Sequence, residues 1–290
     1  MEYTTLNSYL KERFGTKVYK LSLDGGFTCP NRDGTVGTGG CIFCSKGGSG
    51  DFAENRKLSI TSQIENAKNK VSKKINDGKY IAYFQAFTGT YAPVERLKAI
   101  YYEAINHPDI VALSVGTRPD CLGEEVLALL EEINTVKPVF IELGLQTIHK
   151  KSAQYIRRGY SLEVYDKAVE RLHSIGINVV THLILGLPNE SKEDMLQSVE
   201  YVCRVTDGIK LQLLHVLRDT DLARDYAMGK FDTLSLEAYT DIIKSCVEII
   251  PPNVVIHRLT GDGAKKDLIA PLWSADKKNV LNTINKALGN

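Results

Sequence analysis

Three closely spaced cysteines are the residues of this sequence best suited to chemistry. Eleven residues separate Cys29 from Cys41, and two separate Cys41 from Cys44. The C-x-x-C half lets two thiolates bind one metal centre from a tight turn, and the glycines before it let the backbone bring the third thiolate back toward that centre. Two kinds of centre suit this set. A structural zinc site needs four protein ligands, whereas a four-iron cluster held by three cysteines keeps one iron open for a ligand.

The segment around these cysteines differs from the rest of the chain. Residues 25–50 hold nine of the 23 glycines and three of the six cysteines. A loop of this length inside a compact domain is usually functional. Cys203 and Cys246 lie on apolar helical faces, where a cysteine behaves as a small core residue. Cys121 follows a strand, and its sequence distance does not exclude it as a fourth ligand.

Composition narrows the class of protein. The 290 residues are 43% hydrophobic and 24% charged, which is typical of a globular chain. The formal net charge of +1 excludes a uniformly basic nucleic-acid binder, so any RNA contact must come from local patches. We find neither a secretory signal nor an apolar stretch near the roughly 20 residues that span a bilayer. The expectation is a cytoplasmic protein with no membrane partner, in which cysteines stay reduced.

Apolar runs that resemble buried parallel strands alternate with segments of helical spacing. The expected strands are 18–23, 80–88, 110–118, 139–147, 178–187, 208–217 and 254–259. The expected helices are 59–76, 94–106, 124–134, 162–174, 193–205, 236–250 and 277–288. This order predicts an α/β fold, a partial (β/α)6 TIM-like barrel in one domain of residues 1–290. The barrel core spans about 18–235, and a strand and a helix extend it over about 236–290, with functional residues at the carboxyl ends of the strands.

Six motifs together resemble the radical S-adenosylmethionine (SAM) superfamily. More closely, they resemble a small bacterial family related to the catalytic subunit of Elongator. They read CPNRDGTVGTGGCIFC, FQAFTGTYAPVERL, GTRPDCL, ELGLQT, ILGLP and RLTGDG. The usual spacing between the first two cysteines is shorter, although expanded loops occur in relatives of the Elongator subunit. The resemblance implies a barrel of the radical SAM type, in which Cys29, Cys41 and Cys44 hold a [4Fe–4S] cluster whose open iron binds SAM.

The resemblance also places SAM-binding residues at the ends of successive strands. A glutamate that some relatives carry is replaced here by Ser114, which leaves one of those contacts without its acid. Arg158 would pair with the SAM carboxylate through its planar guanidinium, and His182 would meet the ribose. The alternatives are a solvated charge at a helix end and a core histidine. The implied cofactor positions are Phe43, Thr88, Gly89, Gln146, Arg158, His182 and Gly186.

The substrate is implied less directly. Similarity to the Elongator subunit indicates transfer RNA, with modification of a wobble uridine that carries a carboxymethylaminomethyl side chain. A flavodoxin- or ferredoxin-type protein would supply electrons. The alternatives are a small-molecule or porphyrin-like substrate for the same chemistry, and a non-catalytic RNA-binding module stabilised by zinc or a cluster. The residues expected to face substrate are Arg118, His215, Arg258 and Asp262.

Overall fold

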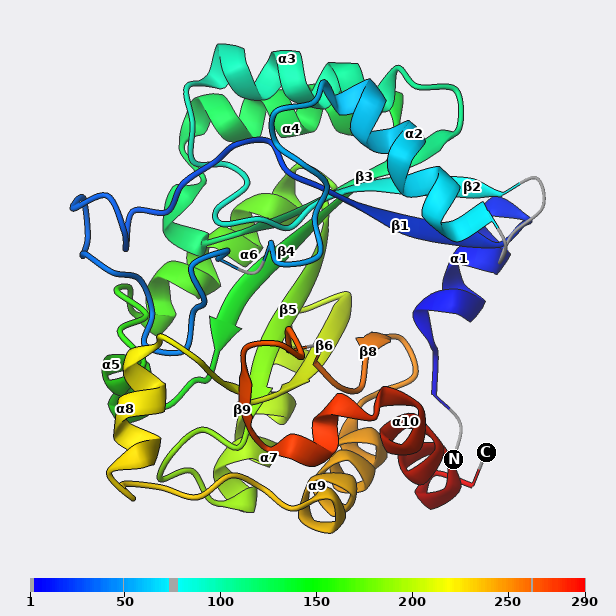
Figure 1. The fold of residues 1–290 in the computed structure, drawn as a ribbon. Coiled ribbons are helices and arrows are strands. Elements are labelled where there is room, and N and C mark those ends of the chain that lie inside the picture. Colours follow the sequence, from blue (N-terminus) through cyan, green and yellow to red (C-terminus); the bar gives the residue numbers. More distant parts are fainter. Residues whose placement is uncertain (1–2, 49, 73–77, 262, 290) are drawn as a thin grey trace.

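A parallel β-sheet curls into an open half-barrel and forms the centre of the molecule (Figure 1). The computed structural model describes residues 3–48, 50–72, 78–261 and 263–289, and within these ranges seven strands form the sheet in the order β1-β2-β3-β4-β5-β6-β8. Every neighbouring pair is parallel. The strands are β1 Val18–Leu23, β2 Lys79–Phe84, β3 Ile110–Thr117, β4 Val139–Gln146, β5 Asn178–Leu185, β6 Gly208–Leu213 and β8 Val255–Arg258. The predicted fold class is confirmed.

Amphipathic helices cover the outer face of the sheet (Figure 1). Each presents buried apolar residues to the strands, such as Leu97 and Tyr101 of one helix and Leu172 of another, all 0% exposed. Ser191 is the N-cap of the last connecting helix before β6. Its side chain accepts a hydrogen bond from the backbone N–H of Asp194 and satisfies a donor of the first turn. The connecting helices are α2 Ile60–Val71, α3 Val94–Ile105, α4 Glu124–Val136, α6 Leu162–Ser174, α7 Lys192–Cys203 and α9 Leu236–Ile249.

The strand register brings inward-facing polar residues to similar levels of the barrel. Glu142 in β4 pairs with Gly116 in β3, and His182 in β5 pairs with Lys210 in β6. Side chains alternate across a strand, so residues two apart face the same side. Polar side chains at several levels therefore line the interior of the barrel, and apolar side chains pack around it.

Several short elements were not predicted. Helices α1 (Leu6–Phe14), α5 (Lys150–Tyr155) and α8 (Asp221–Ala227) are too brief to give a clear hydrophobic period. The predicted strand 208–217 ends at Leu213, and β7 (Val216–Leu217) pairs antiparallel with β9 (Leu268–Ala270) in a separate small sheet.

The amino-terminal segment closes part of the open edge of the barrel. Thr4 accepts a hydrogen bond from the backbone N–H of Ile256 at 2.8 Å, and Thr5 forms a parallel bridge with Ile256. Helix α1 thus lies between the two edge strands, β1 and β8 (Figure 1). At the other end of the chain, α10 (Lys277–Ala287) packs against α9. Within the described residues, the helices are too short and too polar to span a bilayer.

Candidate cluster and SAM site

One cavity of about 390 Å³ lies at the carboxyl ends of the strands, beneath the glycine-rich loop. Cys29, Cys41 and Cys44 all line it. The predicted site residues that also line it are Phe43, Thr88, Arg118, Gln146, Arg158, His182, His215 and Arg258. Gly89 and Gly186 are outside this lining set, and Asp262 lies outside the described residues.

The cysteine loop is held by two of its own polar side chains. The Asn31 amide donates to the carbonyl of Arg157 at 2.6 Å and lies 3.4 Å from Cys41 Sγ, within hydrogen-bond reach of the sulfur. Arg32 donates to the carbonyl of Ser45 at 2.5 Å, and its guanidinium lies over the Phe87 ring, 5.4 Å from the centroid. Both residues therefore direct N–H donors at the segment that carries the sulfur ligands.

The spacing of the sulfur atoms fits a cluster better than a single ion. Zinc with Zn–S bonds of about 2.3 Å in tetrahedral geometry would hold sulfur atoms about 3.8 Å apart. The only group of three candidate ligand atoms within 4.8 Å of one another, in the described residues, is Glu65, His107 and Asp109. The three cysteine sulfurs are thus spread more widely than one tetrahedral zinc requires.

The thiols of Cys41 and Cys44 are protonated at neutral pH. Burial, reinforced by the neighbouring Cys44, raises the pKa of Cys41 to about 11. Burial also raises the pKa of Cys44, although the Arg32 guanidinium acts in the opposite direction. Metal binding requires thiolates and therefore releases these protons.

The turn after β2 ties the cysteine loop to the sheet. The backbone N–H of Thr88 donates to the carbonyl of Thr28 at 3.1 Å, one residue before Cys29. Gly89 lies behind this contact, and its own N–H donates to the carbonyl of Gly116 at 2.8 Å. A Cβ on Gly89 would lie 2.5 Å from a methyl group of Val115. Close packing explains why position 89 is a glycine, and Thr88 is the residue of this turn that lines the cavity.

Arg158 is buried at the cavity wall, where it organises the chain after β4. Its guanidinium donates to the carbonyls of Leu145 at 3.1 Å, Thr147 at 2.6 Å and Tyr160 at 3.1 Å. Burial lowers its pKa. The solvated-charge alternative is therefore wrong, because only 4% of Arg158 is exposed. Pairing with the SAM carboxylate stays a prediction.

The neighbouring Arg118 is also tightly held. It forms a two-pronged ion pair with Asp120 at 2.9 and 2.7 Å, and its remaining nitrogen donates to the carbonyl of Arg158 at 2.8 Å. Gln146 ends β4 with a φ of 71° and faces the same cavity. Together these residues fix the wall beside the cysteine loop.

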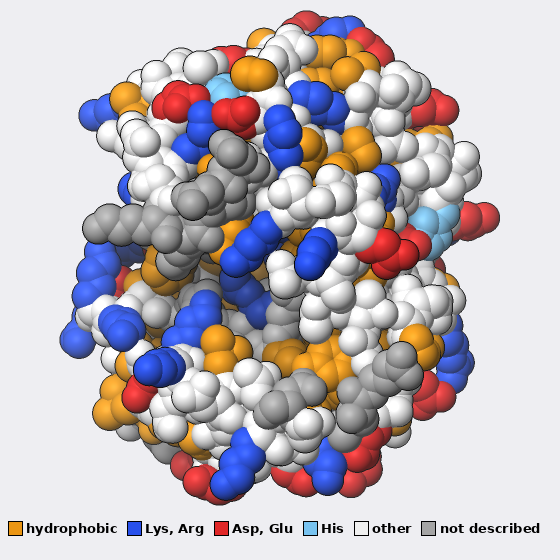
Figure 2. Space-filling view, turned by 90° about the vertical axis from the view of Figure 1, so that its right-hand side faces the viewer, with side chains coloured by type: hydrophobic (Ala, Val, Ile, Leu, Met, Phe, Trp, Pro, Cys, Tyr) orange, Lys and Arg blue, Asp and Glu red, His pale blue; other side chains and the backbone are white. Residues whose placement is uncertain are grey.

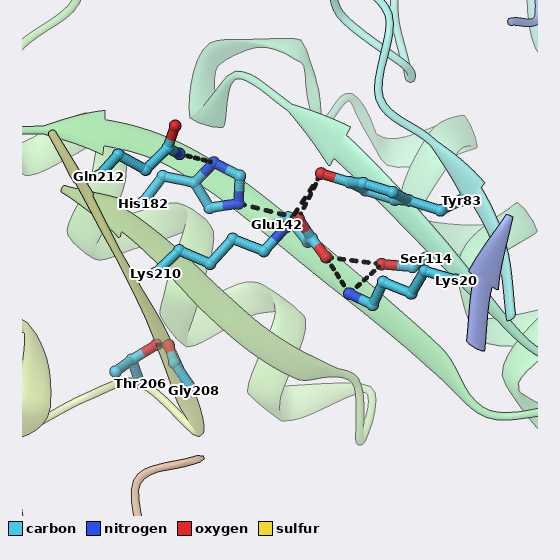
Figure 3. Close-up of polar contacts among 9 residues, drawn as sticks. All are labelled: Lys20, Tyr83, Ser114, Glu142, His182, Thr206, Gly208, Lys210 and Gln212. Atoms are coloured by element: carbon cyan, nitrogen blue, oxygen red, sulfur yellow. Dashed lines mark hydrogen bonds and ion pairs between the residues drawn. The ribbon is translucent and has the colours of Figure 1, made fainter. Parts of the chain in front are cut away.

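Glu142 is the centre of a buried network at the floor of the cavity (Figure 3). One carboxylate oxygen pairs with the Lys20 ammonium and accepts from Ser114 at 2.9 Å. The other pairs with the Lys210 ammonium and accepts from Tyr83 at 2.7 Å and His182 at 2.8 Å. Five donors saturate the carboxylate, which fits a structural centre better than a proton-transferring group.

Electrostatics fix the charge states in this network. Burial disfavours the ionised form of Glu142, but Lys20, Lys210 and His182 outweigh it and hold the carboxyl pKa well below its usual range. Burial and the nearby Lys210 lower the pKa of His182 to about 4, so the ring is neutral. Its Nδ1 accepts from the Gln212 amide at 3.1 Å, and its Nε2 therefore carries the proton given to Glu142.

This environment disfavours the charged form of Lys210. Burial, together with repulsion from Lys20 and Arg258, lowers its pKa to about 7 despite the bond to Glu142. The single carboxylate of Glu142 thus pairs with two buried ammonium groups and does not fully offset the charge of Lys210.

A carboxylate from the next strand lies beside Ser114. Glu142 places its carboxylate 2.9 Å from Ser114 Oγ. The contact that the resemblance left without an acid thus has a carboxylate nearby, although five donors already occupy it.

Two remaining predicted positions lie differently. His215 lines the cavity and packs against the turn after β8, where a Cβ on Gly261 or Gly263 would come within 3.0 or 3.1 Å of its ring. Gly186 has a φ of 88°, and a Cβ there would meet Leu234 at 2.9 Å. Backbone conformation and this packing explain Gly186, and it presents no surface to the cavity in this structure.

A charged residue inside an apolar strand was the available signal for the floor. Lys20, Glu142 and Lys210 each interrupt a run of apolar residues. Burying a charge without a partner is costly, so three such residues in separate parallel strands indicate mutual pairing.

Comparison with known proteins decides the family. The model of the radical SAM superfamily matches residues 32–202, and the Radical_SAM C-terminal domain matches residues 206–290. This chain belongs to the radical SAM superfamily. It is an enzyme whose cofactors are a [4Fe–4S] cluster and SAM, and the predicted cofactors are thus confirmed at the level of the family.

Individual relatives agree with this assignment. Protein YtqA of Bacillus subtilis is 46% identical over 289 residues, which cover 99% of this chain and 90% of that protein. Elongator complex protein 3 of Schizosaccharomyces pombe is 27% identical over 183 residues, covering 61% of this chain and 32% of that protein. The solved Elp3 of the archaeon Methanocaldococcus infernus has a TM-score of 0.69 at 18% identity, covering 90% of this chain and 63% of that one. This last likeness shows a shared fold.

Proposed function

We propose that this radical SAM enzyme acts on a wobble uridine of transfer RNA and removes the carboxymethyl part of a carboxymethylaminomethyl side chain. The observation that carries the proposal is the similarity to Elongator complex protein 3 across 61% of the chain. The motif resemblance links that relative to wobble-uridine chemistry. A flavodoxin- or ferredoxin-type electron donor and a cytoplasmic location belong to the same proposal.

The chemistry suits the cofactors of the family. When bound, the cluster and SAM would supply a 5′-deoxyadenosyl radical, which can remove a hydrogen atom from a carbon of the substrate. Loss of a hydrogen atom and one further electron from the carbon between nitrogen and carboxylate, with SAM as the net oxidant, would give an imine. Water would then hydrolyse the imine to the aminomethyl group and glyoxylate. The residues of this chain contribute binding, orientation and exclusion of water. Cys29, Cys41 and Cys44 would hold the cluster, with Phe43 beside it.

The cavity has the size of a small-ligand pocket, and the cluster and SAM would occupy part of it. A volume of about 390 Å³ lies within the range of pockets for small ligands. Enzymes that modify a base commonly take it out of its stack into such a pocket. The same volume would admit a free small molecule, which is the alternative substrate class.

Basic side chains occur both in the cavity below the cysteine loop, where Arg32, Arg118 and Arg158 line it, and at the opposite end of the barrel. Figure 2 views the end at which β1 and β2 begin, and Lys and Arg side chains gather around a hollow on that face. Two of the lysines near this end are paired, Lys68 with Asp109 at 2.7 Å and Lys70 with Glu54 at 2.5 Å. We expect the anticodon loop to bind at the cavity mouth, where these arginines lie.

Nucleoside analysis of a deletion strain tests the proposal. Mass spectrometry of its transfer RNA should show accumulation of carboxymethylaminomethyluridine forms and loss of the corresponding aminomethyl forms. The wild-type gene should restore the profile, and a Cys44→Ala gene should not. An unchanged nucleoside profile in the deletion strain would reject the transfer-RNA function and favour a small-molecule substrate.

A further inference from the structure

The deep end of the cavity is polar, and several strands contribute to it. Tyr83 from β2, His182 from β5, Gln212 from β6 and Arg258 from β8 all line the cavity. Figure 3 shows the first three converging on the region of Glu142. These groups lie in the strands themselves, whereas the cysteines lie in the loop above their carboxyl ends. The cavity therefore has a metal-binding end and a separate polar floor.

Strand pairing explains why an arginine reaches this floor. The register between β6 and β8 shifts between Ile209 and Lys210, so Arg258 rather than His257 is the partner of Lys210. Lys210 faces inward to Glu142, and Arg258 lines the cavity at its side. The irregularity thus places a guanidinium at the level of the buried network.

The floor carries more basic side chains than acidic ones. Lys20 and Lys210 share the single carboxylate of Glu142, Lys210 is charged in part at neutral pH because its pKa is lowered to about 7, and His182 is neutral. Charge interactions are strong in a buried site with a low effective dielectric constant. The floor therefore favours an anionic group over a neutral or cationic one.

We infer that the floor binds the carboxylate of the substrate, with Arg258 as its direct contact. This inference rests on the proposed function, because the carboxymethylaminomethyl side chain ends in a carboxylate. A guanidinium matches a carboxylate with two parallel hydrogen bonds. Binding the carboxylate at the floor orients the adjacent CH₂ toward the cysteine end of the cavity. SAM also carries a carboxylate, but in the radical SAM family that group binds at the open iron of the cluster.

Binding to anticodon stem-loops tests this site with the reconstituted, SAM-loaded enzyme. Three synthetic stem-loops differ only at the wobble uridine, which carries a carboxymethylaminomethyl group, its neutral carboxamide analogue or an aminomethyl group. We expect the enzyme to bind the carboxylate form about tenfold more tightly than the carboxamide, as for a hydrogen-bonded charge pair. Arg258→Gln should reduce this preference to below threefold, and Arg258→Lys should retain part of it.

A matched control removes the same charge elsewhere. The Lys46 side chain is 85% exposed, and Lys46→Gln should keep the tenfold preference. The affinity of Arg258→Gln for SAM should be unchanged, and a tenfold loss would assign Arg258 to the cofactor instead and overturn the inference. Equal binding of the carboxylate and carboxamide forms by the unmodified enzyme would also overturn it, even if Arg258→Gln failed to fold. The deletion-strain profile judges the transfer-RNA function separately from either result.

Discussion

The substitution Glu142→Gln tests whether the floor network stabilises the barrel. It removes the charge that compensates Lys20 and Lys210, whose side chains are 15% and 6% exposed. Breaking a buried ion pair by removing one partner typically costs about 3–5 kcal/mol, because it leaves an uncompensated buried charge. In a chain of this size each kcal/mol shifts the melting temperature by about 2 °C, so the expected fall is about 6–10 °C.

Circular dichroism melting of the reconstituted protein at pH 7.5 measures this fall. Glu132→Gln is the matched control, because Glu132 pairs with Lys98 at 2.9 Å while both side chains are about half exposed. Exposed pairs contribute about 0–1 kcal/mol, so the control should melt within about 2 °C of the wild type. If Glu142→Gln melts no lower than Glu132→Gln, the network does not stabilise the fold and the charge assignment is wrong.

Three further outcomes follow from the same contacts. Cys41→Ala should leave the fold intact but reduce the iron content well below four atoms per chain and abolish SAM cleavage, whereas near-full iron loading would refute its role as a ligand. Asn31→Leu removes the amide donor near Cys41 Sγ and should lower the cluster reduction potential, because hydrogen bonds to ligand sulfur raise it; an unchanged potential in an EPR redox titration contradicts this. Between its lowered pKa of about 7 and the usual value of 10.5, Lys210 binds fewer protons in the folded state than in the unfolded state. Its contribution to the free energy of unfolding should therefore rise by about 2 kcal/mol from pH 7 to pH 9. Lys210→Met should therefore gain less stability than the wild type between pH 7 and pH 9 when melting is followed. If the melting temperatures of the two proteins change in parallel with pH, the lowered pKa of Lys210 is contradicted.

The sequence predicted the fold in detail because buried parallel strands leave a strong signal. Val18–Leu23 matches β1 at both ends, and Leu162–Ser174 matches α6. The run after Gly208 was predicted as one strand through Leu217, but the chain leaves the sheet after Leu213 and pairs β7 with β9 instead. Apolar runs do not reveal which partner a strand takes, since that depends on distant residues.

The candidate site was predictable where a residue type is rare and its chemistry narrow. The three cysteines share one cavity, as their spacing indicated. Residues that act through packing were harder to place. The ILGLP motif predicted Gly186 as a cofactor contact. In the structure, Leu234, which lies 48 residues later in the chain, occupies the space beside it. The Glu142 network depends on register across β1 to β6, which no local pattern records.

The division of the chain into a barrel core and an extension stays a prediction. The matched family regions meet between residues 202 and 206, whereas the sheet continues through β6 and β8. Arg258 lies in the second region and lines the cavity formed largely by the first. Both regions therefore contribute to the candidate site.

A coupled assay tests the central claim most directly. The purified, reconstituted enzyme is incubated anaerobically with SAM, a reductant and transfer RNA from the deletion strain, and 5′-deoxyadenosine and modified nucleosides are measured together. The account predicts that carboxymethylaminomethyluridine disappears as 5′-deoxyadenosine forms in proportion, and that Cys44→Ala gives neither change. Formation of 5′-deoxyadenosine with an unaltered wobble uridine would contradict the proposed substrate, and a single bound zinc without SAM cleavage would contradict the whole account.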